Sequence, residues 1–286
     1  MYHFQKSSII LILIQSCLIM FLSFSVVAND EFVKGKVEYK NGNYTKAISL
    51  FKVAAEQNNV SAQSYLGYMF SKGKGVNKDF ETAFTWYSKA AEQGGAREQH
   101  TLAMMFEKGR GTTQDYKKAI EWHTKAAMQD YARSQFHLAM IYQNGKGISK
   151  DDSLALKWYT KAAKDGNEHV QYTLGKMYEK GHGTVIDYKH AALWYEKSVK
   201  QDYKKAQSAL GFLYAEGRGV AKNIEKSIAL LTKAADQGDA KAQYQLGIMY
   251  SNSQGVIQDP KQAALWYQKA AEQGYNKAQD QHLKSF

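Results

Sequence analysis

Apolar and polar positions recur along this chain with a period of 36 residues. From about residue 59 to residue 274 the same pattern appears six times without insertion or deletion. One position of the period holds an indole in every copy except the fifth, where Leu230 stands. The tryptophans are Trp86, Trp122, Trp158, Trp194 and Trp266. Leucine, glutamine and glycine recur with the same step, so the pattern predicts a tandem-repeat protein.

Each copy contains two stretches with helical spacing of apolar residues. In the third copy we expect a first helix, helix A, over about 132–144 and a second, helix B, over about 152–164. Asp151 can cap helix B by accepting hydrogen bonds from free backbone N–H groups, and Gly166 can end it in a left-handed conformation. The equivalent capping residues are Asp79, Asp115, Asp187, Asn223 and Asp259.

The small residues of helix B indicate how the repeats pack. Paired alanines such as Ala162 and Ala163 allow close approach of neighbouring helices, and we expect Trp158 to fill the wider gap one turn earlier as a core side chain. One helix pair cannot bury both of its faces, so the repeats must stack. We therefore predict an all-α fold, an α-solenoid wound as a right-handed superhelix of helix–turn–helix repeats.

The first 28 residues have a different layout. Lys6 precedes an apolar stretch over 9–27, which ends in the small residue Ala28 before polar Asn29. This is typical of a secretory signal peptide, so we predict cleavage after Ala28 and a periplasmic or secreted protein. The alternative is an uncleaved inner-membrane anchor, because nineteen helical residues span roughly 29 Å. Cys17 also permits a lipoprotein, although apolar residues continue after it.

Composition excludes several classes of protein. Hydrophobic residues make up 44% and charged residues 23%, which fits neither a disordered chain nor a multi-span membrane protein. The single cysteine excludes a disulfide framework, a thiolate zinc site and an iron–sulfur cluster. Cleavage after Ala28 would remove that cysteine and one lysine, lowering the net charge from +11 to +10.

Residues 66–94 resemble a Sel1-like repeat. They contain, in order, Leu-Gly, an aromatic residue, Gly-Lys-Gly-Val, Asp, Ala, Trp-Tyr and Lys-Ala-Ala-Glu-Gln-Gly. The likeness extends over 59–286, whereas the segment before it looks more like a tetratricopeptide repeat. The expected organisation is a signal peptide (1–28), an atypical N-terminal repeat (29–58), six Sel1-like repeats (59–274) and a C-terminal capping helix (275–286).

The resemblance implies a bacterial, exported α-solenoid that binds other proteins. Cysteine-rich relatives have been linked to penicillin binding, but this chain lacks the repeat cysteines, so that association is not transferred. Departures from the motif are Leu230 and Leu231 for Trp-Tyr, His123 for Tyr, Ala103 and Ala139 for Gly, and Ser253 for the first turn glycine.

Candidate catalytic and metal-binding residues are few. The histidines form no H-x-x-x-H pair, and we expect His100 to lie near Phe136 rather than near another histidine. Gly-Arg110-Gly and Gly-Lys146-Gly lack the strand that precedes a phosphate-binding loop, so we interpret them as turns. No G-x-S-x-G motif occurs. We therefore predict no enzyme activity, no catalytic residue, no cofactor and no metal site.

Basic residues form two ladders across the repeats. The helix B ladder lies near helix C-termini, where cations are favoured, and we interpret it as a solvated face. Its alternative is contact with an acidic partner or the anionic membrane surface. Nucleic acid is not expected, because no recognition motif is present. The ladders are Lys89, Lys125, Lys161, Lys197, Lys233 and Lys269, and Lys74, Arg110, Lys146, His182 and Arg218.

Binding is expected at the variable positions of helix A, because the constant positions build the solenoid. In tetratricopeptide-like geometry these line the concave face. The candidates are Arg97, His100, Arg133, Phe136, Tyr172, Lys176, Lys205, Phe212, Lys241 and Tyr244. Aromatic residues beside cations suit an interface and favour a peptide or protein with acidic and apolar residues. The alternative is that Phe136, Tyr172 and Phe212 only pack on adjacent helices.

The function favoured by these features is a non-enzymatic, monomeric scaffold that binds a protein partner. One alternative is a periplasmic immunity protein that neutralises a delivered toxin. Another is an enzyme or binder acting on cell-wall material, which would need converging acids or a nucleophile in a cleft.

Overall fold

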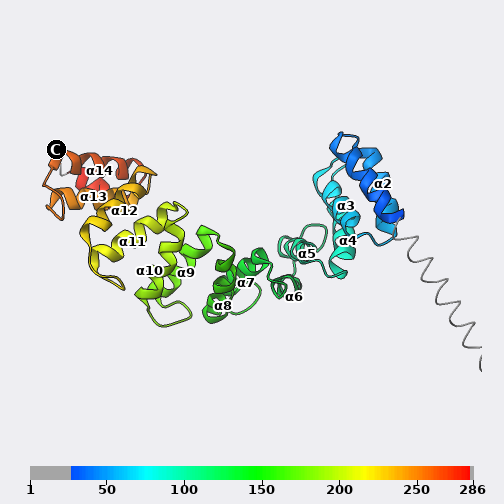
Figure 1. The fold of residues 1–286 in the computed structure, drawn as a ribbon, viewed down its shortest axis with the longest axis horizontal. Helices are drawn as coiled ribbons and strands as arrows, with labels where there is room; N and C mark the ends of the chain where they lie inside the picture. Colours follow the sequence, from blue (N-terminus) through cyan, green and yellow to red (C-terminus); the bar gives the residue numbers. More distant parts are fainter. Residues whose placement is uncertain (1–26, 284–286) are drawn as a thin grey trace, which may run out of the picture. The chain divides into compact units, whose positions relative to one another are not determined.

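The computed structural model describes residues 27–283, and helical hairpins follow one another along the chain (Figure 1). The chain divides after Ser134 into two compact units. The predicted signal peptide lies almost entirely outside the described residues. Within residues 27–283, every helix is too short or too polar to traverse a bilayer.

Unit 1 contains the N-terminal hairpin and two complete repeats. Residues 27–40 are helical. They are followed by α2 (Tyr44–Glu56), α3 (Val60–Lys72), α4 (Phe80–Glu92), α5 (Ala96–Lys108), α6 (Tyr116–Ala127) and the start of α7 (Ala132–Asn144). The A helices of this unit are α3 and α5, and the B helices are α4 and α6.

Unit 2 contains the rest of α7 and the remaining helices. These are α8 (Asp152–Ala162), η1 (Ala163–Asp165), α9 (Glu168–Lys180), α10 (Tyr188–Val199), α11 (Lys204–Glu216), α12 (Ile224–Asp236), α13 (Ala240–Ser251), α14 (Pro260–Glu272) and α15 (Asn276–Leu283). The described residues form no strand. The predicted all-α class of helix–turn–helix repeats is confirmed, and α7 has the predicted bounds.

Acidic residues cap the B helices as predicted. The Asp151 carboxylate accepts a hydrogen bond from the Leu154 N–H at 2.8 Å, and Asp79 accepts from two backbone N–H groups at 3.0 Å. The same role falls to Asp115, Asp187, Asn223 and Asp259. Each cap satisfies donors that a helix N-terminus leaves free. Gly166 is left-handed after α8, with φ of 88°.

In four of the six repeats, the core contains a contact between a glycine of helix A and a bulky residue of helix B. A Cβ atom at Gly175 would lie 2.7 Å from the Tyr195 ring, and one at Gly247 would lie 2.5 Å from the Tyr267 ring. In these repeats a side chain in place of the glycine would clash with the ring, whereas the second and third repeats carry Ala103 and Ala139 at this position. Where the tyrosine is replaced by Leu231, a glycine still faces it.

This contact corrects the prediction that tryptophan fills the core. Tyr159 and Tyr195 are among the largest fully buried side chains, whereas Trp158 and Trp194 are half-buried and pack at the edge of the core. Of the five indoles only Trp266 is buried. Neighbouring helical residues differ in direction by 100°, so the tyrosine faces helix A and the tryptophan faces the edge.

The helix B ladder of lysines lies over these indoles. Lys197 Nζ is 3.9 Å from the ring centroid of Trp194, three residues earlier. The same pairing joins Lys89 to Trp86, Lys125 to Trp122, Lys161 to Trp158 and Lys269 to Trp266. A cation over an indole is stabilised by the ring quadrupole. Five of the six lysines of this ladder therefore form cation–π pairs, so the ladder is not only a solvated face.

The constant glutamine of helix A joins one repeat to the next. Gln243 donates through Nε2 to the Ala235 carbonyl at 2.9 Å, and its Oε1 accepts from Gln273 Nε2 at 2.7 Å. Gln63 does the same in unit 1. Both glutamines are buried, and a buried amide without partners is costly. This explains why the residue recurs in every repeat.

The first prediction concerns the glycine–tyrosine contact. Gly175→Ala should lower the free energy of unfolding by about 1–3 kcal/mol, because the new methyl group overpacks the Tyr195 ring. Replacing glycine by alanine within a helix normally raises the free energy of unfolding, so a decrease in Gly175→Ala would indicate the clash with the ring. Urea denaturation measures the change. Ala139→Gly, at the equivalent position of the third repeat, is the matched control, and a stabilised Gly175→Ala variant would contradict the packing account.

The second prediction concerns the turn of the last repeat. Ser253 is left-handed, with φ of 57°, where the equivalent residues such as Gly73 are glycines. Ser253→Gly should raise the free energy of unfolding by about 1 kcal/mol, because glycine adopts this conformation without strain. Thermal unfolding measures the gain. Gly73→Ser should have the opposite effect, and a loss of stability in Ser253→Gly would argue against strain at this turn.

Candidate functional site

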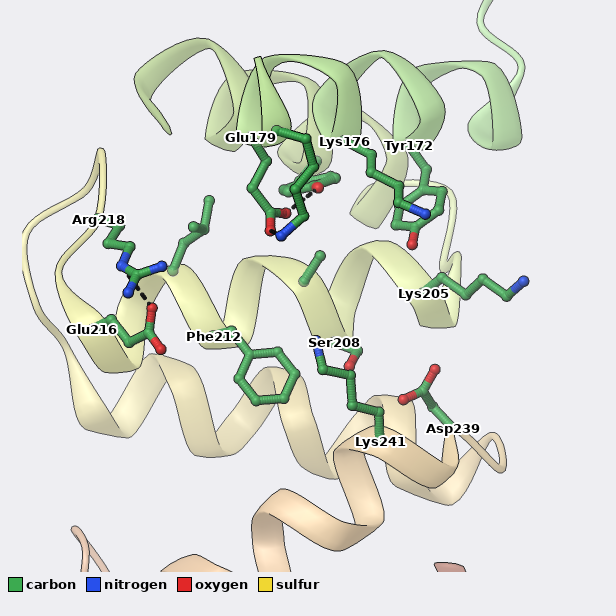
Figure 2. Close-up of a pocket in the computed structure, with 14 residues that line it drawn as sticks. Tyr172, Lys176, Glu179, Lys205, Ser208, Phe212, Glu216, Arg218, Asp239 and Lys241 are labelled. Carbon is green, nitrogen blue, oxygen red and sulfur yellow. Dashed lines mark hydrogen bonds and ion pairs between the residues drawn. The ribbon is translucent and has the colours of Figure 1, made fainter. Parts of the chain in front are cut away.

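Three A helices of unit 2 line a cavity of about 590 Å³, which we name the groove (Figure 2). In this view α11 lies between α9 and α13. Half of the residues predicted for binding line it, namely Tyr172, Lys176, Lys205, Phe212 and Lys241. They meet because residues at equivalent positions of successive A helices face the same side of a helical stack.

The apolar part of the groove is aromatic. Phe212 is half-buried, and Lys241 Nζ lies 4.1 Å from its ring centroid. Tyr172 is half-buried against Tyr195 and Tyr203, with ring centroids 5.7 and 5.4 Å away, and burial raises the pKa of Tyr172. These rings therefore both pack on neighbouring helices and line the groove, which combines the two interpretations that the sequence left open.

The carboxylates of the groove are engaged within the protein. Glu179 accepts a hydrogen bond from the Tyr195 hydroxyl at 2.6 Å and pairs with Lys180 at 3.1 Å. Glu216 pairs with Arg218 at 2.9 Å. Asp239 caps α13 by accepting from a backbone N–H at 2.9 Å.

Two lysines of the groove are differently placed. Lys176 and Lys205 are exposed, and within residues 27–283 neither forms an ion pair. They leave a surplus of positive charge over the engaged carboxylates. The groove can therefore bind an anionic group beside an apolar side chain.

The other five predicted residues lie outside the groove. Arg97 lines a separate hollow of about 270 Å³ in unit 1, and Arg133 is exposed. Phe136 packs near Tyr159, with ring centroids 5.9 Å apart, which favours the packing interpretation. Tyr244 packs between two tyrosine rings.

His100 also lies outside the groove and corrects one expectation. Its ring centroid is 5.2 Å from that of His123, and its Nδ1 is 3.0 Å from the Ser134 hydroxyl. The expectation that no other histidine lies near it is therefore wrong. His123 belongs to helix B of the same repeat, and the sequence argument considered only neighbouring A helices.

Several residues of the groove were not predicted. Glu216 and Asp239 line it, and so does Arg218 from the turn after α11. Arg218 belongs to a basic ladder, so the sequence marked it for another reason, whereas Asp239, the residue before α13, was not marked. Glu216 and Arg218 lie after Phe212, the last residue of α11 that was predicted for binding, which is why both were missed.

Comparison with known proteins identifies the repeat. The model of the Sel1 repeat matches residues 34–59, 60–95, 99–131, 132–167, 169–203, 204–239 and 240–275. The first match includes much of the segment that looked tetratricopeptide-like. No curated protein matches the sequence.

Solved structures agree with this match. A protective antigen of uropathogenic Escherichia coli with an SLR fold is 34% identical over 89% of this chain and 56% of its own, with a TM-score of 0.84. This chain thus spans little more than half of that antigen. A Sel1 repeat protein from Oxalobacter formigenes is 31% identical over 84% of this chain and 99% of its own, with a TM-score of 0.64.

A more distant match is an immunity protein from Pseudomonas aeruginosa, 21% identical over 79% of this chain and 81% of its own, with a TM-score of 0.36. A likeness at this level supports no functional argument for this chain.

The third prediction concerns pH. Burial, and then the hydrogen bond to Glu179, raise the pKa of Tyr195 above its ordinary value of 10.0. The unfolded chain ionises first, so this stability is present below pH 10 and is lost as the pH rises above it. The free energy of unfolding should therefore fall less above pH 10 in Tyr195→Phe than in the unaltered protein. Urea denaturation at pH 7 and pH 11 tests this, and equal falls would contradict it.

Proposed function

Because this chain belongs to the Sel1-repeat family, we propose that it is a non-enzymatic scaffold that binds a protein or peptide partner through the groove of unit 2. Sel1-repeat proteins generally bind protein partners. The observation that carries the proposal is the pair of exposed lysines, Lys176 and Lys205, beside the half-buried ring of Phe212.

The partner that fits this groove is a polypeptide segment with acidic and apolar residues. A carboxylate near Lys176 and Lys205 gains attraction without displacing an existing ion pair. An apolar side chain against Phe212 removes apolar area from water, worth about 25 cal/mol per Å². Aromatic residues at the centre with charges around them are the usual anatomy of an interface.

The engaged carboxylates support a binding role over an enzymatic one. General acid–base chemistry needs a carboxyl group that can exchange its proton with a substrate. The groove carboxylates are instead held by other groups of the protein. Glu179 accepts a hydrogen bond from the Tyr195 hydroxyl, Glu216 pairs with the Arg218 guanidinium, and Asp239 caps the N-terminus of α13.

We also propose that the protein acts in the periplasm or is secreted. The support is the signal-like layout of residues 1–28, whose alternative is an inner-membrane anchor. A groove outside the cytoplasm would meet segments of envelope or secreted proteins.

The fourth prediction is a loss of partner binding in the double variant Lys176→Glu and Lys205→Glu. Reversing both charges should lower recovery of the partner at least tenfold, because each carboxylate would repel the acidic segment. The measurement is crosslinked co-purification from the native envelope, followed by mass spectrometry.

Two matched controls accompany it. Arg97→Glu reverses a charge in unit 1, outside the groove, and Lys233→Glu reverses an exposed charge on helix B. Both should recover the partner normally. If the double variant recovers every partner as well as the unaltered protein, the groove is not the binding site.

A further inference from the structure

Two surface positions of the repeat change character along the chain. One lies in the turn, two residues after the second glycine, and the other lies in helix B, one residue before the indole position. Both are exposed in all six repeats. In the first three repeats they are polar: Asn77, Thr113 and Ser149 in the turn, and Thr85, Glu121 and Lys157 in the helix. In the last three they are apolar: Val185, Ala221 and Ile257, and Leu193, Ala229 and Leu265.

The larger aliphatic side chains at these positions stand in solvent. Val185 is 80% exposed and Ile257 is 90% exposed, in the turns before α10 and α14. Leu193 and Leu265, in those two helices, are 54% and 42% exposed. Single exposed apolar residues are ordinary, but apolar columns confined to consecutive repeats mark an interaction surface.

Lysines flank the exposed leucines. Lys189 and Lys197 lie one helical turn on either side of Leu193, and Lys261 and Lys269 do so around Leu265. Residues four apart lie on the same face of a helix, so each leucine is bracketed by positive charge. We name this surface of α10, α12 and α14, with the turns before them, the outer face.

We infer that the outer face of unit 2 binds an anionic lipid surface. Aliphatic side chains bracketed by lysines are the composition of segments that lie in the interface of an anionic membrane, where lysine is attracted to the headgroups. A protein partner fits less well, because interface cores are enriched in aromatic residues and arginine and depleted in lysine.

This inference is independent of the groove. The groove is lined by A helices together with Tyr195 of α10 and Arg218 of a turn, whereas the outer face consists of other residues of the B helices and their preceding turns. A scaffold with both surfaces could hold a polypeptide segment while resting on a membrane leaflet. Each surface can therefore be tested without the other.

The fifth prediction uses a local probe, so that residues 1–28 do not obscure the result. In the full chain with Cys17→Ser, an environment-sensitive fluorophore is attached at Ala221→Cys, in the apolar turn column. The matched control carries it at Thr113→Cys, the equivalent turn of the second repeat. On vesicles of phosphatidylglycerol and phosphatidylcholine, the fluorescence at 221 should rise and shift to the blue. It should stay unchanged at 113.

A second variant tests the aliphatic residues themselves. Val185→Asn, Leu193→Thr, Ile257→Ser and Leu265→Thr together introduce residues that the first three repeats already carry at these positions, so folding should be preserved. This variant should need at least about tenfold more lipid for the same shift at 221, since burial of aliphatic area is lost. The double variant of Lys176 and Lys205 should keep the full shift.

Three results would overturn the inference. One is no shift at 221 on anionic vesicles, and another is an equal shift on vesicles of phosphatidylcholine alone. The third is an unchanged lipid response in the four-site variant; if that variant also lost a crosslinked protein neighbour, the outer face would be a protein-docking surface.

Discussion

The structure depends on one close approach, between the side chain that follows the indole position in helix B and a position of helix A that holds glycine in four of the six repeats. At Gly175 there is no room for a methyl group beside the Tyr195 ring. This contact sets the separation of the two helices within a repeat. Once that separation is fixed, the ring is fully buried and its hydroxyl reaches Glu179 at the edge of the helix pair.

The same regularity explains how repeats are joined. A buried glutamine can satisfy its amide only if the previous helix B ends beside it and the next helix B ends within reach, as around Gln243. An insertion in either turn would leave the amide unpaired in the interior, which is costly. The 36-residue period is thus kept constant by the hydrogen bonds of the buried glutamine amide as well as by apolar packing.

Because the constant residues hold the repeats together, the residues at surface positions can differ from repeat to repeat. Some of these variable residues interact with a neighbouring side chain that also differs between repeats. Arg218 lies over the ring of Tyr188, 5.5 Å from its centroid, whereas in the preceding repeat His182 lies 3.6 Å from the carboxylate of Asp152. Within residues 27–283, Lys176 forms no ion pair and Leu193 is exposed to solvent, and positions of this kind carry the binding proposals.

The sequence by itself determined the period, the helix–turn–helix unit, the Asp caps such as Asp151 and the variable columns that contain half of the groove. These features depend on the spacing of apolar residues and on the residue types that cap a helix, and both can be read from a single sequence. Only the tertiary structure decided that Tyr195 and not Trp194 is the core residue. The two residues are adjacent in helix B, and the position of the neighbouring helix A determines which of them is buried. It also decided which variable residues meet: Phe212 lies against Lys241 of the next A helix, and Phe136 packs both on Tyr159 of its own repeat and on His169 of the next.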